Sequence, residues 1–176
     1  MIFNKVRLFA ISVGIIIVAG CNENSKLQKE IAQKESELKN DTTGVVNYAK
    51  AQQMIDLYIS YARLNPVDTI SAYYLFKAAD VAAHAHQPQL ALNLYDSVII
   101  NFPKYNGVAD AYFFKAFLLD NVQYDKVKAS EAYQQLLVKF PNYHQAESVR
   151  WLLQNMYKTD LEIAHELIGK QNDSIQ

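Results

Sequence analysis

The chain has 176 residues, of which 51% are hydrophobic and 20% are charged, a composition typical of a globular protein and not of a disordered one. Its 17 basic and 18 acidic residues give a net charge of −1, which argues against a general nucleic-acid binder because such a protein needs a basic face. A single cysteine excludes an intrachain disulfide, and five glycines with four prolines are few for an all-β chain.

The first twenty residues have the organisation of a secretory signal. Lys5 and Arg7 precede an apolar run over residues 8–18, which is too short to span a membrane. Two small residues then lead to Cys21. We predict a cleaved signal over residues 1–20, whose removal leaves 15 basic and 18 acidic residues and a net charge of −3. The alternative is an ordinary signal peptide, or an uncleaved anchor, with an incidental cysteine.

The next segment, residues 21–42, is strongly polar. Leu27, Ile31 and Leu38 follow a narrow helical stripe, but Lys34 falls where the seam of a coiled coil requires an apolar residue. We therefore predict a solvated tether of partial helicity, and a dimerising coil is the alternative.

Residues 43–169 carry apolar residues at helical spacing nearly throughout, and no stretch alternates as a strand would. This pattern predicts an all-α fold with about six to seven helices, followed by a flexible tail over residues 170–176. Prolines and capping residues mark the helix ends. The predicted starts and stops are Asn65-Pro66, Asp68, Gln87-Pro88, Phe102-Pro103, Asn106-Gly107, Asp125, Phe140-Pro141, Thr159 with Glu162, and Gly169.

An internal repeat is the strongest indication of the fold. Residues 72–105 align without gaps on residues 110–143 at an offset of 38, with identity at nine of 34 positions. Chance would give about two at ordinary residue frequencies. The identical pairs are Tyr74/Tyr112, Phe76/Phe114, Lys77/Lys115, Ala78/Ala116, Ala91/Ala129, Tyr95/Tyr133, Phe102/Phe140, Pro103/Pro141 and Tyr105/Tyr143.

The repeat resembles the tetratricopeptide repeat (TPR) family. With Ala72 as its first position, the family pattern falls on Leu75, Ala79, Ala91, Tyr95 and Pro103. The second unit departs from the pattern at Phe117, where a small residue is expected, and the third unit opens with Trp151. The resemblance implies a short right-handed α-solenoid of helix pairs, in which stacked units share one core.

The string Val18-Ala19-Gly20-Cys21 resembles the signal box of bacterial lipoproteins, which implies that Cys21 is lipidated and becomes the first mature residue. Three acyl chains, palmitate among them, would then anchor the protein stably in a membrane. Asn22 replaces the aspartate that commonly retains such lipoproteins at the inner membrane. This analogy favours an outer-membrane lipoprotein facing the periplasm, with the inner membrane or the cell surface as alternatives. The Phe-Pro-x-Tyr endings also resemble those of small periplasmic and outer-membrane TPR lipoproteins.

The TPR resemblance implies a concave groove lined by the first helix of each unit. Aromatic side chains carry much of the binding energy at protein interfaces, so we expect this groove to bind another envelope protein. The alternative is that these aromatics are ordinary core between repeats. The implied groove residues are Tyr73, Phe76, Asp80, His84, Ala111, Phe114, Leu118, Asn121, Val149 and Leu152.

The sequence contains few residues arranged for chemistry. His84 and His86 lie two apart, which fits either half of a metal site or an exposed turn, and no carboxylate flanks them closely. No nucleophile, base and orienting group can be assembled. We therefore expect no enzymatic activity, no metal, no cofactor beyond the covalent lipid, no nucleic-acid partner and no small-molecule substrate. The expected function is a lipid-anchored envelope adaptor, and the alternative is a constitutive structural subunit of an outer-membrane assembly or envelope-maintenance complex.

Overall fold

The computed structural model describes residues 23–38 and 47–173. Within these ranges the chain forms eight helices that pack in adjacent pairs and no strand, so the predicted all-α fold is confirmed. The predicted signal peptide 1–20 and Cys21 lie outside the described residues.

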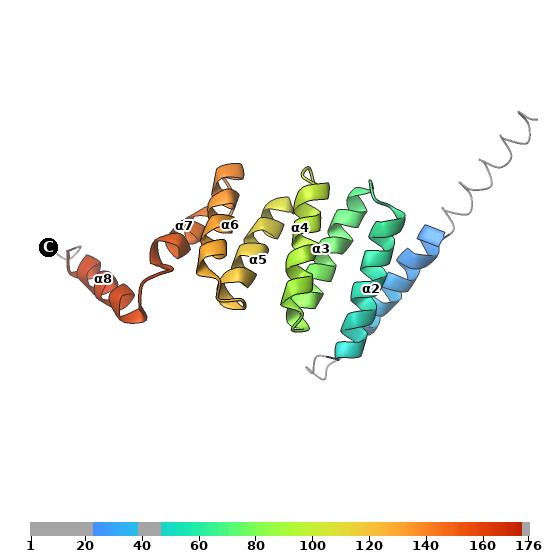
Figure 1. Ribbon diagram of the computed structural model, residues 1–176, viewed down its shortest axis with the longest axis horizontal. Coiled ribbons are helices and arrows are strands. Elements are labelled where there is room, and N and C mark those ends of the chain that lie inside the picture. The colour runs from blue at the N-terminus through green and yellow to red at the C-terminus, as the bar shows by residue number, and fades with distance from the viewer. Residues whose placement is uncertain (1–22, 39–46, 174–176) are drawn as a thin grey trace, which may run out of the picture. The chain divides into compact units, whose positions relative to one another are not determined.

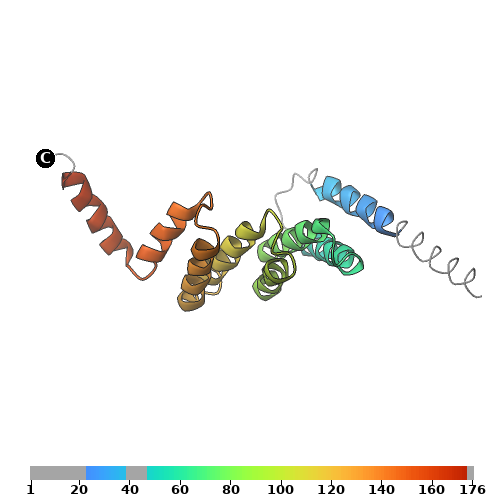
Figure 2. The same cartoon turned by 90° about the horizontal axis from the view of Figure 1, so that it is seen from above.

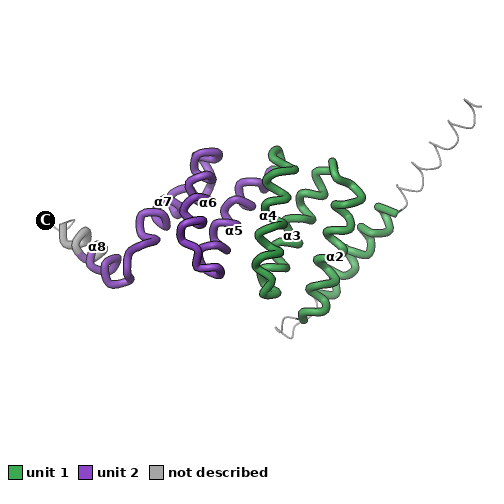
Figure 3. Tube along the Cα trace, in the orientation of Figure 1, with its two compact units in different colours: residues 1–105 green, residues 106–176 purple. Residues whose placement is uncertain are grey.

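The chain divides into two compact units, Met1–Tyr105 and Asn106–Gln176, where the sequence predicted a single domain (Figure 3). The boundary falls between the two sequence repeats. This division has a physical basis, because repeat proteins bury their core between neighbouring helices and each segment contacts little beyond its neighbours.

The first unit consists of a helix over residues 23–38 followed by three helices joined by short turns (Figure 1). Successive helices run in opposite directions, so the α2–α3 turn and the α3–α4 turn lie at opposite ends of the unit. The labelled helices are α2 (Tyr48–Leu64), α3 (Thr69–His84) and α4 (Pro88–Asn101).

The helix over residues 23–38 corrects the prediction of a solvated tether. The segment is helical, as expected, but it packs along α2 (Figure 2). Ile31 is only 1% exposed, and Gln28 Nε2 donates to the Tyr61 hydroxyl at 3.0 Å. The narrow apolar stripe is enough to dock this helix because polar side chains beside the stripe add specific hydrogen bonds. The tether prediction failed because composition alone does not reveal such partners.

The second unit also consists of four helices, and its last two differ in how far they are buried. Ala146 and Val149 are buried on α7, whereas none of the α8 side chains that the structure describes is buried. Leu161 and Ile168 on α8 are 68% and 58% exposed. The helices are α5 (Val108–Asn121), α6 (Lys126–Lys139), α7 (Ala146–Asn155) and α8 (Asp160–Asp173).

Most predicted helix boundaries are confirmed. Asp68 accepts a hydrogen bond from the Ile70 backbone N–H at 2.9 Å, and Asp125 accepts one from Lys128 at 3.0 Å, so both cap helices. Pro88 is the first residue of α4, where its missing N–H costs nothing.

The C-terminal boundary was predicted wrongly. Helix α8 runs through Gly169 to Asp173, so residues 170–173 of the predicted flexible tail are helical. A glycine inside a helix costs only about 1 kcal/mol relative to alanine, which does not force a stop.

The proline-containing turn that ends each predicted repeat recurs in nearly identical geometry. Phe102 has φ −129° and ψ 55°, and Phe140 has φ −132° and ψ 67°. Asn65, which precedes Pro66 at the end of α2, has φ −130° and ψ 60°. In all three turns the backbone N–H of this residue donates to the carbonyl four residues earlier, at 2.8–3.0 Å. The sequence repeat is therefore a structural repeat, and α2 ends in the same way.

The repeat positions form the core of each unit. Ala79, Ala91 and Tyr95 in the first unit are at most 1% exposed, and Ala129 and Tyr133 in the second are fully buried. Small side chains let paired helices approach closely, and the tyrosine rings fill the space that remains.

Candidate functional site

The exposed face of α3 carries part of the predicted groove. Tyr73 is 44% exposed, and its ring lies 5.3 Å from Lys77 Nζ in a cation–π contact. The ring also contacts Tyr74 at a centroid distance of 5.5 Å. Tyr73 is thus held by its neighbours while much of its surface faces solvent, which is the arrangement expected of an interface aromatic.

The other predicted groove residues of the first unit have partners inside it. Phe76 is half-buried with its ring 5.7 Å from that of Tyr95, and Asp80 accepts a hydrogen bond from the Tyr95 hydroxyl. His84 is exposed, with Nδ1 2.8 Å from the Asp80 carbonyl oxygen. Of the four predicted residues on α3, Tyr73 and His84 are therefore available to a partner, while Phe76 and Asp80 support the fold.

Lys77 joins three helices at the base of this surface. Its ammonium forms an ion pair with Glu35 on the helix over residues 23–38, and it lies 5.4 Å from the ring centroid of Tyr58 on α2. The Tyr58 hydroxyl donates to the same Glu35 carboxylate at 2.7 Å. Burial alone would lower the pKa of Lys77, but the hydrogen bonds to Glu35 and Tyr58 reverse this effect and raise it. Burial followed by the bond to Glu35 raises the pKa of Tyr58.

The second unit corrects three of the predicted groove residues. Ala111 and Val149 are 0% exposed and Leu118 is 5% exposed, so these side chains belong to the core and cannot line a groove. They face inward because α5 and α7 bury their apolar stripes within the unit. Asn121 is exposed and donates to the Phe117 carbonyl at 3.1 Å, while Leu152 is half-buried.

Two aromatic rings on α5 are exposed side by side. Phe114 and Phe117 are 38% and 44% exposed, and both contact the half-buried Phe113, at centroid distances of 5.4 and 6.3 Å. We call Phe114 and Phe117 the α5 aromatic face. The sequence predicted Phe114 and missed Phe117. The signal for Phe117 was present, since this bulky residue stands where the TPR pattern expects a small one.

A tyrosine from the following turn supports the α5 aromatic face from below. The Tyr143 hydroxyl donates to Asp110 on α5 at 2.8 Å, and its ring lies 6.0 Å from that of Phe113. Burial and the hydrogen bond to Asp110 raise the pKa of Tyr143. Phe113 is therefore fixed between α5 and this turn, and the two exposed rings rest on a rigid base.

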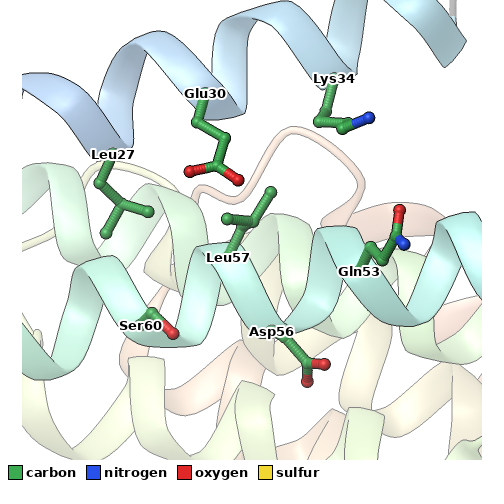
Figure 4. A pocket seen from close by; sticks show the side chains of 7 residues that line it. All are labelled: Leu27, Glu30, Lys34, Gln53, Asp56, Leu57 and Ser60. Carbon is green, nitrogen blue, oxygen red and sulfur yellow. The ribbon is translucent and has the colours of Figure 1, made fainter.

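An open pocket of about 380 Å³ lies between the helix over residues 23–38 and α2 (Figure 4). Leu27 and Glu30 are directed from the first helix toward Leu57 on α2. The sequence analysis missed this pocket because it treated the first helix as a tether. The lining residues are Leu27, Glu30, Lys34, Gln53, Asp56, Leu57 and Ser60.

The two histidines near the α3–α4 turn are placed separately from any acidic cluster. His86 has a left-handed backbone conformation with φ 55°, and both His84 and His86 are exposed. Within residues 23–38 and 47–173, no three His, Cys, Asp or Glu side chains gather in a way that could hold a metal ion. None of the helices described in these ranges combines the length and apolar character needed to cross a bilayer.

Comparison with known proteins adds no relative. No protein-family model matches the chain, and no curated protein matches it.

Proposed function

We propose that this chain is a lipid-anchored adaptor of the bacterial cell envelope, whose TPR-like helical repeats bind another envelope protein. Lipid on Cys21 would anchor it, with the outer membrane and its periplasmic side as the proposed location. In this proposal the chain binds and positions a partner, and no chemical step, cofactor or nucleic-acid contact is assigned to it.

The observation that carries the proposal is the α5 aromatic face. Phe114 and Phe117 expose 38% and 44% of their surface although Phe113 beside them offers cover. Burying exposed aromatic surface against a partner releases water from it and contributes binding energy, whereas leaving it in water does not. Tyr73 on α3 presents a second exposed ring with similar support in the first unit.

A membrane anchor would make modest affinity sufficient. Confining the repeats and a membrane-bound partner to one surface raises their effective concentration, so that occupancy no longer depends on tight binding in solution. This argument favours a small aromatic surface of the kind seen on α5 over an extensive interface.

The alternative is a constitutive structural subunit of an outer-membrane assembly or envelope-maintenance complex. Helix α8 favours it, because Leu161 and Ile168 are 68% and 58% exposed and a permanent partner would cover them. A complex of fixed stoichiometry that survives detergent extraction would support the subunit over the adaptor.

Site-specific photocrosslinking in cells tests the adaptor. A photoreactive residue at Phe114 or Phe117 should capture one protein that the same residue at Val138 does not. Val138 is 81% exposed on α6, so it is a control for accessibility. A Phe114→Ala/Phe117→Ala variant should lose the partner in a pull-down while its circular dichroism spectrum stays helical. Undiminished recovery of the partner by this variant would refute the assignment of the surface.

A further inference from the structure

The end of the first unit that holds the α2–α3 turn is unusually apolar. Leu64 is the last residue of α2, Val67 lies in the turn and Ile70 is the second residue of α3. These three side chains are 49%, 93% and 42% exposed, and we call them the apolar tip. Ile100, the other strongly exposed aliphatic residue among those described in this unit, is 71% exposed near the end of α4 and lies at the same end.

The repeat shows that this apolar character is not required by the turn. The three proline turns have the same backbone geometry, so their residues can be matched one to one. Where the first turn has the apolar tip, the second has Asn101, Lys104 and Gly107, and the third has Lys139, Asn142 and Gln145. Exposed apolar side chains cost solubility, so their presence in one of three equivalent turns indicates a contact that the other two do not make.

The N-terminus of the first helix lies at this same end. Asn65 Nδ2 donates to Asn24 Oδ1 at 3.1 Å, and Asn24 Nδ2 donates in return to Asn65 Oδ1. Cys21 precedes Asn24 by three residues, and three residues span at most about 11 Å of extended chain. A lipid on Cys21 would therefore hold the bilayer within about that distance of the end of the unit that carries the apolar tip.

We propose that the apolar tip inserts into the lipid bilayer beside the lipidated cysteine, so that the first unit sits directly on the membrane in a fixed orientation. This inference rests on the lipid anchor in the proposed function. Aliphatic side chains at the tip gain free energy by leaving water for the acyl region.

The charges around the tip fit a lipid surface. Arg63 and Lys104 are exposed at this end and can contact anionic headgroups. Of the acidic groups here, Asp68 is engaged by the Ile70 N–H and the Tyr61 hydroxyl, at 2.9 and 3.0 Å. Glu23, at the start of the first helix, is exposed.

A fluorescent reporter at position 67 tests the insertion. The chain has one cysteine, and lipidation would consume its thiol, so Val67→Cys would provide the single reactive thiol of the lipidated protein. The full chain is labelled with an environment-sensitive dye and reconstituted in vesicles of phosphatidylethanolamine and phosphatidylglycerol whose acyl chains carry a nitroxide near the headgroup. Gln89→Cys is the control, since Gln89 is exposed on the first turn of α4 at the opposite end of the same unit. The length of α3 separates the two ends by about 24 Å.

We expect a blue shift and several-fold stronger nitroxide quenching at position 67 than at position 89. Adding Leu64→Lys and Ile70→Gln, which places there the residues of the third turn, should lower the quenching at position 67 toward that of the control. Equal quenching at the two positions, or quenching that survives the two polar substitutions, would overturn the insertion while leaving the anchor intact. Protein that carries two reactive thiols and does not float with the vesicles would overturn both the anchor and the insertion.

Discussion

Tyr95 and Tyr133 occupy the same place in the two repeats but differ in one hydrogen bond, and this makes a matched test of the core. Tyr95 is 1% exposed and its hydroxyl donates to Asp80. Tyr133 is 0% exposed, and its hydroxyl has no partner among the described residues. The cause is a substitution at the equivalent position, where Leu118 stands in place of Asp80.

The expected effects of replacing each tyrosine by phenylalanine have opposite signs. Tyr95→Phe removes a hydrogen bond to a carboxylate, which should lower the free energy of unfolding by about 1.5–3 kcal/mol. Tyr133→Phe removes a buried hydroxyl that is desolvated without compensation, and each such group costs about 1–3 kcal/mol. Tyr133→Phe should therefore leave the free energy of unfolding unchanged or raise it by about 1 kcal/mol.

Urea unfolding followed by circular dichroism measures both variants. Because the chain has two compact units, hydrogen exchange with mass spectrometry should accompany it and report α3 and α4 separately from α5 and α6. The loss in Tyr95→Phe should appear in α3 and α4. If Tyr133→Phe is destabilised as much as Tyr95→Phe, the Tyr133 hydroxyl has a stabilising partner and the reasoning is refuted.

Three further predictions concern the first helix, the tyrosines and α8. Glu35→Gln should weaken the ion pair with Lys77 and increase hydrogen exchange across residues 23–38, and unchanged protection there would show that apolar contacts alone hold this helix. Burial raises the pKa of several tyrosines, so the unfolded state loses their protons first and the free energy of unfolding should fall as pH rises above about 10. Absorbance at tyrosinate wavelengths should then rise together with the loss of helical signal, and tyrosinate forming well before unfolding would contradict this. Thr159→Ala should increase exchange in the first turn of α8 by removing one half of a capping box, in which Thr159 N–H donates to Glu162 at 2.7 Å. Because backbone and side-chain hydrogen bonds from Thr159 lower the pKa of Glu162, the same turn should fray as pH falls through that range, and exchange that does not change with pH would argue against the box.

Local rules were sufficient for much of the fold. Asp68, Pro88 and Asp125 act as predicted because capping and proline effects depend on a few neighbouring residues. The repeat was equally visible, since Ala91 and Tyr95 recur as Ala129 and Tyr133 and all four are buried. A regular spacing of small and aromatic residues is enough to predict that helices pair, because it places small side chains where two helices must approach closely.

The groove was predicted less well because a position in a repeat does not determine exposure. Ala111, Leu118 and Val149 hold positions that the family places on a surface, yet each is buried. Phe117 was set aside as a misfit, and it is among the exposed aromatic residues. Which side of a helix is covered depends on the neighbouring helix that packs against it, and that neighbour is not encoded in the local pattern.

The sequence by itself determined the helical class, the helix boundaries near proline and capping residues, and the repeat, because each depends on residues close together in the chain. Only the tertiary structure showed that the helix over residues 23–38 packs on α2 and brings Asn24 to Asn65, a pair 41 residues apart. It also showed that the chain divides into two units and that one of three equivalent turns is apolar at an exposed end. These features depend on contacts between distant residues, where the energy of docking one polar helix is a small balance of burial and hydrogen bonds that composition does not predict.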